Sequence, residues 1–234
     1  MKSTPHPAVD RIGPYRVIHL SKILDPATEK RRCAVRRHEA PVLGVTDYHS
    51  DIDIMSHLGT HVEAPCHHGA LTKDVTALPF THYMGRGVLL RLDTCAPRAL
   101  VTRAGLEAAD RGRCRSGDIL VLDSPYHSEP FVVSASDERP QLSRAAAEWF
   151  VEKRVKAVGF GDGVAIENNP EHCVACHDLM LGNDILFIEV MQNIGQLREP
   201  EFMVIFQPLP IRGLDSSPVN IVAIEGVPGF GPAA

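Results

Sequence analysis

Short apolar runs, each bounded by turn-forming residues, recur along the chain and constrain its fold more than any other feature. Runs this short are typical of β-strands. They lie at residues 16–20, 51–55, 87–92, 119–122, 157–160, 185–188, 203–206 and 221–224. Helices are expected at fewer places: a short one through Ala109 capped by Thr102, one over 144–155 capped by Ser143, and one over 173–180. Strands outnumber helices and only partly alternate with them, which predicts an α/β fold built as a single strand-rich domain.

No linker or internal repeat divides the sequence. The chain has 234 residues, of which 44% are hydrophobic and 23% charged, an ordinary composition for a globular domain with a sizeable core. Residues 1–13 are polar and contain prolines, so we expect a loose N-terminal arm there. The folded domain is expected over residues 14–234.

The charge and hydropathy of the chain exclude several classes of partner. A net charge of -5 offers no basic surface to nucleic acid. No apolar run is long enough to span a bilayer, and the N-terminal sequence MKSTPHPAVDRIGPYRV lacks the apolar centre of a signal peptide. These features predict a cytoplasmic protein that acts on a small molecule and binds neither nucleic acid nor a membrane.

Six cysteines are scattered along the chain, and in a reducing compartment they are expected to be free thiols. Cys173 to His177 matches the C-x-x-C-H pattern of covalent haem attachment. That attachment follows export, for which the sequence shows no signal, so the pattern does not favour haem. A thiol-redox pair formed by Cys173 and Cys176 is a second alternative.

The segment HLGTHVEAPCHH, residues 57–68, holds four histidines and one glutamate. In an extended chain every second side chain falls on one face, so His57, His61, Glu63 and His67 would point the same way. The alternative is a set of polar loop residues or histidines satisfied inside a core. Three imidazoles and a carboxylate on one face favour a divalent metal site over that alternative.

The segment must bend to use these side chains together. Four extended residues span about 13 Å, too far for His57 and His61 to hold one ion at about 2 Å each. Gly59 and Pro65 stand where the two bends are needed. A zincin-type helix is excluded because Leu58 replaces the glutamate of that motif and Gly59 disfavours a helix interior.

The run from 57 to 67 resembles the H-x-G-T-H-x-D-x-P-x-H signature of the bacterial cyclase family. That family includes metal-dependent kynurenine formamidases, isatin hydrolases and polyketide cyclases. The likeness extends to HDLMLGNDILFIE at 177–189, to the turn and strand at 115–120, and to PIRGLDSSPV at 210–219. It therefore covers most of the chain.

The resemblance implies a swivelling β/β/α fold that is usually dimeric. It also implies that His57, His61 and Glu63 hold one metal ion. His177 and Glu189 would help to hold a second, with Glu63 and Glu189 bridging the two.

By the same likeness, His67 would shuttle a proton as general base or acid, a role that suits an ordinary histidine pKa of about 6.5. Asp53 and Asp184 are candidate acceptors that would orient the ligand histidines. The sequence favours the alternative that each is a solvated residue of a turn or strand edge.

Two positions depart from the family pattern. Glu63 stands where formamidases of the family have aspartate, and its longer side chain predicts one ion, two ions at a different spacing, or one weakly held ion. The segment Leu20 to Pro26 lacks the aromatic residue that stacks on substrate in those formamidases. This lowers the expectation that N-formylkynurenine is the substrate.

The leading prediction is a metal-dependent hydrolase, similar to arylformamidases, that opens an amide, lactam or lactone of a small substrate with Zn²⁺ or Mn²⁺. A polyketide-type cyclase with the same site is one alternative, and a non-catalytic metal-binding relative is another. We expect a homo-oligomer, either a dimer or a tetramer.

Overall fold

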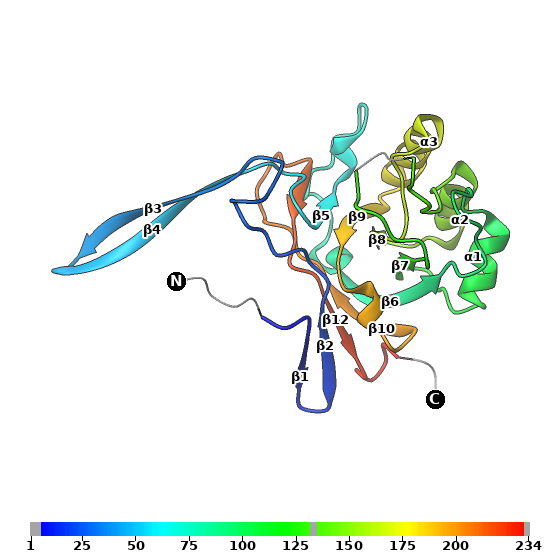
Figure 1. Ribbon diagram of the computed structural model, residues 1–234, viewed down its shortest axis with the longest axis horizontal. Helices are drawn as coiled ribbons and strands as arrows, with labels where there is room; N and C mark the ends of the chain where they lie inside the picture. The colour runs from blue at the N-terminus through cyan, green and yellow to red at the C-terminus, as the bar shows by residue number, and fades with distance from the viewer. Residues whose placement is uncertain (1–5, 132–134, 232–234) are drawn as a thin grey trace.

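The computed structural model describes residues 6–131 and 135–231. Its main element is a ten-stranded sheet with the order β1-β2-β12-β10-β6-β7-β8-β9-β5-β11, and β3 and β4 form a separate hairpin (Figure 1). The strands are β1 Val9–Ile12, β2 Tyr15–His19, β3 Cys33–Val42, β4 Val45–Ile54, β5 His61–Glu63, β6 Met84–Arg91, β7 Ile119–Asp123, β8 Ala157–Gly161, β9 Leu186–Met191, β10 Glu201–Ile205, β11 Ser216–Pro218 and β12 Val222–Glu225. The helices are α1 Arg103–Asp110, α2 Arg144–Lys153 and α3 Pro170–Leu181, with 3-10 turns η1 Pro65–His67, η2 Phe80–Tyr83 and η3 Ile194–Gln196.

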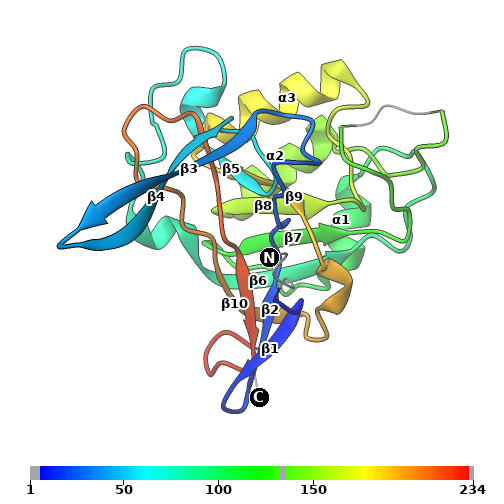
Figure 2. The ribbon, with the colours of Figure 1, turned by 60° about the vertical axis from the view of Figure 1, so that its left-hand side comes forward.

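The parallel strands β6 to β9 lie between two hydrophobic clusters. The three helices gather on one side of these strands (Figure 2). Leu120 and Leu122 of β7 pack against them. On the other side Ile119 and Val121 pack with residues of β2, β10 and β12, because the sheet curls back on itself. Both faces are buried, so these strands read as continuous apolar runs. The expected single strand-rich α/β domain is confirmed.

The predicted helix starts are confirmed by their caps. The Thr102 side chain accepts a hydrogen bond from the Gly105 amide, and the Ser143 side chain accepts one from the Ala146 amide. Helix α3 begins earlier than predicted because Asn169 caps it and Pro170 occupies its first position.

The prediction of a loose arm over 1–13 is wrong for part of that range. Residues 9–12 form β1, which pairs antiparallel with β2 across a turn at Gly13. The positive φ of Gly13, +56°, makes this tight turn possible. Residues 1–5 lie outside the described residues.

The hairpin of β3 and β4 projects from the body of the molecule (Figure 1). The strand expected at 51–55 is only the end of β4, and β3 escaped prediction because its charged residues interrupt the apolar pattern. Val35 lies opposite Ile52 on one face of the hairpin, and both side chains are exposed. Leu43 at the tip is 99% exposed.

Within residues 6–131 and 135–231, no helix combines the length and the apolar character needed to cross a bilayer.

Candidate metal centre

The segment with most of the predicted ligands folds as a turn, strand β5 and η1. Gly59 has φ +59°, a left-handed conformation that bends the chain between His57 and His61. The Gly59 carbonyl accepts a hydrogen bond from His61 Nδ1 at 2.8 Å, which leaves His61 Nε2 facing the site. Pro65 opens η1, which ends at His67. Both predicted bends are confirmed.

Strand β5 lies between β9 and β11 and turns His61 and Glu63 to the same side. His61 stands opposite Glu189 in the β5–β9 register. His61 Nε2 lies 3.6 Å from Glu189 Oε2 and 3.7 Å from Glu63 Oε1. All three side chains are buried. The pairing of β5 with β9 therefore brings Glu189 next to His61 and Glu63.

Helix α3 brings His177 to the same place. Its Nε2 lies 3.5 Å from Glu63 Oε2. Its Nδ1 donates a hydrogen bond to the Cys173 carbonyl at 2.7 Å, and its ring lies 4.9 Å from the ring of Phe187. These contacts fix the ring so that one nitrogen points at Glu63.

Asp215 links the remaining two histidines. Its Oδ2 lies 2.8 Å from His57 Nε2 and 3.4 Å from His67 Nδ1. Glu63 Oε1 lies 3.0 Å from His57 Nδ1 and 3.6 Å from His67 Nε2. The structure thus brings together the five predicted ligands and the predicted proton shuttle His67.

The two candidate orienting carboxylates are not at the site. Asp53 lies on the hairpin and pairs with Arg32, and Asp184 pairs with Lys73. Asp215 contacts the histidines instead. Its only sequence signal was its place in the segment 210–219, and no local spacing predicts the contact with the 57–67 loop.

The charges and donor atoms at this site fit a cation. His61 Nε2 and Glu63 Oε2 are buried and lack a hydrogen-bond partner among the described residues, an arrangement that is costly unless another group satisfies them. Three sets of possible ligand atoms gather within 4.8 Å: His57, His61 and Glu63; Glu63, His67 and His177; and His57, His67 and Asp215. Imidazole and carboxylate donors of this kind suit Zn²⁺ or Mn²⁺.

The two glutamates differ in their tendency to ionise. Burial opposes ionisation of Glu63, but contacts led by His177 and His57 outweigh it and hold the pKa of Glu63 well below its usual range. Burial, followed by the nearby charge of Glu63, raises the pKa of Glu189 well above its usual range. A cation between two such carboxylates would stabilise the charged form of both.

A bulge follows Glu189 in β9. Val190 has φ +59°, which is rare for a β-branched residue, and the β8–β9 register shifts here. Thr60 Oγ1 donates a hydrogen bond to the Val190 carbonyl at 2.6 Å and accepts one from the Lys22 amide at 2.7 Å. Thr60, the neighbour of His61, therefore connects the 57–67 segment to this bulge by a hydrogen bond.

The cysteines of the C-x-x-C-H match do not lie in the surroundings that a redox or haem site needs. Cys176 is fully buried in the core, and burial raises its pKa to about 12. A thiol this buried has neither the access nor the thiolate character of a reactive cysteine. His177 of the same match faces Glu63.

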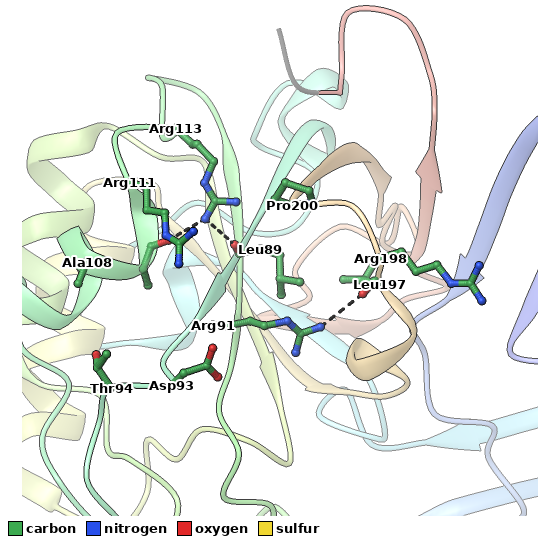
Figure 3. A pocket seen from close by; sticks show the side chains of 11 residues that line it. Leu89, Arg91, Asp93, Thr94, Ala108, Arg111, Arg113, Leu197, Arg198 and Pro200 are labelled. Carbon is green, nitrogen blue, oxygen red and sulfur yellow. Dashed lines mark hydrogen bonds between the residues drawn. The ribbon is translucent and has the colours of Figure 1, made fainter. Parts of the chain in front are cut away.

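Two cavities of similar size differ in whether they adjoin this centre. One, of about 440 Å³, is lined in part by His57 and Val190 and therefore adjoins the centre. The other, of about 390 Å³, lies between the end of α1 and η3 and is lined by four arginines (Figure 3). Arg91 there pairs with Asp123, and Arg113 donates to the Leu89 carbonyl, so both have structural partners.

Comparison with known proteins identifies the family of this chain. The model of the cyclase family, described as "Putative cyclase", matches residues 13–168. A kynurenine formamidase of Bordetella petrii is 24% identical over 180 residues, which cover 75% of this chain and 80% of that protein.

Solved structures share the fold. Isatin hydrolase A of Labrenzia aggregata, bound to benzyl benzoate, superposes with a TM-score of 0.73 at 19% identity, covering 91% of this chain and 94% of that one. Isatin hydrolase A of Ralstonia solanacearum gives 0.69 at 18% identity, covering 91% and 92%. The family match spans more than half of the sequence and includes the 57–67 loop, so this chain belongs to the cyclase family.

Proposed function

We propose that this protein is a metal-dependent hydrolase that cleaves an amide, lactam or lactone bond of a small substrate. The observation that carries the proposal is the position of Glu63. One of its oxygens faces His57 and His61, and the other faces His177 from a remote helix. The similarity to a kynurenine formamidase and to isatin hydrolases supports hydrolysis of an amide or lactam in particular.

We assign His57, His61 and Glu63 to one ion position, and Glu63, His177 and Glu189 to a second. The shared glutamate has an oxygen available for each position, which supports a site for up to two ions. Zn²⁺ and Mn²⁺ both suit the donor set. Such an ion, when bound, activates water near neutral pH and polarises the carbonyl under attack.

The other residues of the site position groups and move protons. His67 is half-buried and lies close enough to receive the proton of the attacking water and to return it to the leaving nitrogen or oxygen. Asp215 contacts His67 Nδ1, so the opposite ring nitrogen is the one presented to the reaction. The same carboxylate holds His57 in place.

A substrate panel tests the proposal directly. Purified protein is freed of metal with a chelator, reloaded with Zn²⁺ or Mn²⁺, and mixed with formanilides, cyclic amides and lactones. We expect acid release that is lost with the chelator and restored by the metal. Metal binding without turnover would instead support a non-catalytic relative, and ring closure of a polyketide chain without hydrolysis would support a cyclase.

We further propose a cytoplasmic homodimer that uses the hairpin as its contact. The free thiols support a reducing compartment. An isolated two-stranded hairpin is marginally stable in water, and the apolar side chains of Val35, Tyr48 and Ile52 are exposed on one of its faces. Sedimentation of the wild type and of Ile52→Asp tests this: we expect a dimer and a monomer, respectively.

A further inference from the structure

Arg31 lines the cavity beside the proposed metal centre and, unlike the two lysines there, is not paired with a carboxylate of the described residues. Among the described lysines and arginines that line it, Lys22 pairs with Glu29 at 2.9 Å and Lys30 pairs with Glu129 at 3.1 Å. Arg31 has no carboxylate within ion-pair distance in the part of the chain that the structure describes. Its positive charge is therefore available to a ligand.

Arg31 is half-buried and held in place without being neutralised. Its guanidinium donates a hydrogen bond to the His57 carbonyl and lies 4.8 Å from the centre of the Phe131 ring. The carbonyl and the aromatic face orient the guanidinium, and its remaining N–H groups are available to donate to a ligand. An oriented guanidinium of this kind is suited to a planar anion such as a carboxylate.

The arginine is also close to the reaction. It contacts the backbone of His57, whose ring is at the centre. The same cavity is lined by Val190, which follows Glu189. Leu58 and Pro130 add apolar walls. An anion bound to Arg31 would therefore place an attached apolar or aromatic body between these walls, next to the bond to be cleaved.

We propose that Arg31 is a specificity-determining residue that binds a carboxylate of the substrate, so that the enzyme prefers amides carrying an acid group beside the scissile bond. The inference rests on the proposed hydrolase function. It names the substrate class as aryl or apolar amides with a carboxylate, and it assigns to Arg31 the charge recognition that the metal ligands do not supply.

Two substrates of matched shape test it. Formanilide and 2-formamidobenzoate share a ring and a scissile bond, but only the second has a carboxylate. For the metal-loaded wild type we expect the higher kcat/KM on 2-formamidobenzoate. Arg31→Met should lower that value about 10- to 100-fold, mainly through KM, and lower the value for formanilide far less. Arg31→Lys should recover part of the loss.

Arg32→Met is the matched control. Arg32 is the next residue in the chain, pairs with Asp53 and is not part of the cavity lining. We expect its kinetics on both amides to equal those of the wild type. Metal content and melting temperature of each variant show whether the centre and fold are intact.

Equal losses on both amides in Arg31→Met would overturn the inference, because they would reduce Arg31 to a support for the His57 backbone. A wild type that hydrolyses formanilide as well as the acid would also overturn it, while leaving the hydrolase proposal intact. If neither amide is hydrolysed, the hydrolase proposal is in question and calorimetric titration with benzoate decides about Arg31. Weaker benzoate binding by Arg31→Met than by the wild type supports the inference, and equal binding overturns it.

Discussion

His61 and Glu189 stand opposite each other on the antiparallel strands β5 and β9, with His61 Nε2 3.6 Å from Glu189 Oε2. The backbone hydrogen bonds of the sheet set this distance, so the two halves of the proposed centre are brought together by the fold. Side chains carried on strands are held more precisely than side chains carried on loops.

His61→Ala should abolish tight metal binding and activity. It removes a buried nitrogen, the proposed ligand atom, which has no hydrogen-bond partner among the described residues, so we expect its loss to affect the ion more than the fold. Elemental analysis after dialysis measures the metal, and circular dichroism checks the fold. His68→Ala, which removes an exposed contact with Asp178, is the control. A full complement of tightly held metal in His61→Ala would show that the ligand is misassigned.

His67→Ala should keep its metal and lose turnover by roughly 10²–10⁴-fold, the usual contribution of a positioned acid or base. The measurements are kcat on the best substrate and metal content of the same sample. His67 also belongs to a possible ligand set with Glu63 and His177. Loss of metal from the variant would assign His67 to that ligand set. An unchanged kcat would show that His67 takes no part in proton transfer.

Asp215→Asn should weaken metal binding or activity by about 10- to 100-fold, as is typical when a group that orients a ligand histidine is changed. Burial lowers the pKa of His57, but Glu63 and Asp215 together raise it, so the amide would alter both the orientation and the charge of that ring. Competition with a chelating dye gives the affinity. Asp178→Asn serves as a control, because Asp178 contacts His68, which is not assigned to the site.

A buried ion pair away from the centre predicts a specific loss of stability in acid. Arg139 is buried and lies 2.8 Å from Asp137, to which Asn168 also donates. Burial opposes ionisation, yet these contacts lower the pKa of Asp137 to about 2 from its ordinary value of 3.8. A folded-state pKa below the unfolded one stabilises the protein above about pH 4, and this stabilisation is lost as the pH falls towards 2.

The free energy of unfolding of the wild type and of Asp137→Asn, measured in urea from pH 6 to pH 2, tests this. The difference between the two proteins should shrink by about 2 kcal/mol on acidification, since a protonated aspartate no longer benefits from the ion pair. A difference that stays constant with pH would mean that the charge of Asp137 contributes nothing.

Local chemistry made parts of the structure predictable. The caps at Thr102 and Ser143 act within a few residues, so the sequence around them sufficed to place both helices. The bends at Gly59 and Pro65 followed from the reach of an extended chain. The nearness of His177 to the loop came only from the family resemblance, because no local rule relates positions that far apart.

Other features depend on long-range packing and could not be predicted. Asp215 meets His57 because β11 pairs with β5, and neither short strand has a distinctive pattern. The positive φ of Val190 is unexpected for valine and is maintained by its surroundings, including the hydrogen bond from Thr60. Strand β3 is charged and lies outside the core, so apolar periodicity does not reveal it.

The projecting hairpin is inserted between two residues of the proposed site. Cys33, its first residue, comes shortly after Arg31, and Ile54, its last, comes shortly before His57. A second subunit bound to this arm would therefore restrain both Arg31, the proposed substrate-selecting residue, and His57, the first of the proposed metal ligands. Dilution would then release both residues at once, and specific activity would fall as the protein is diluted.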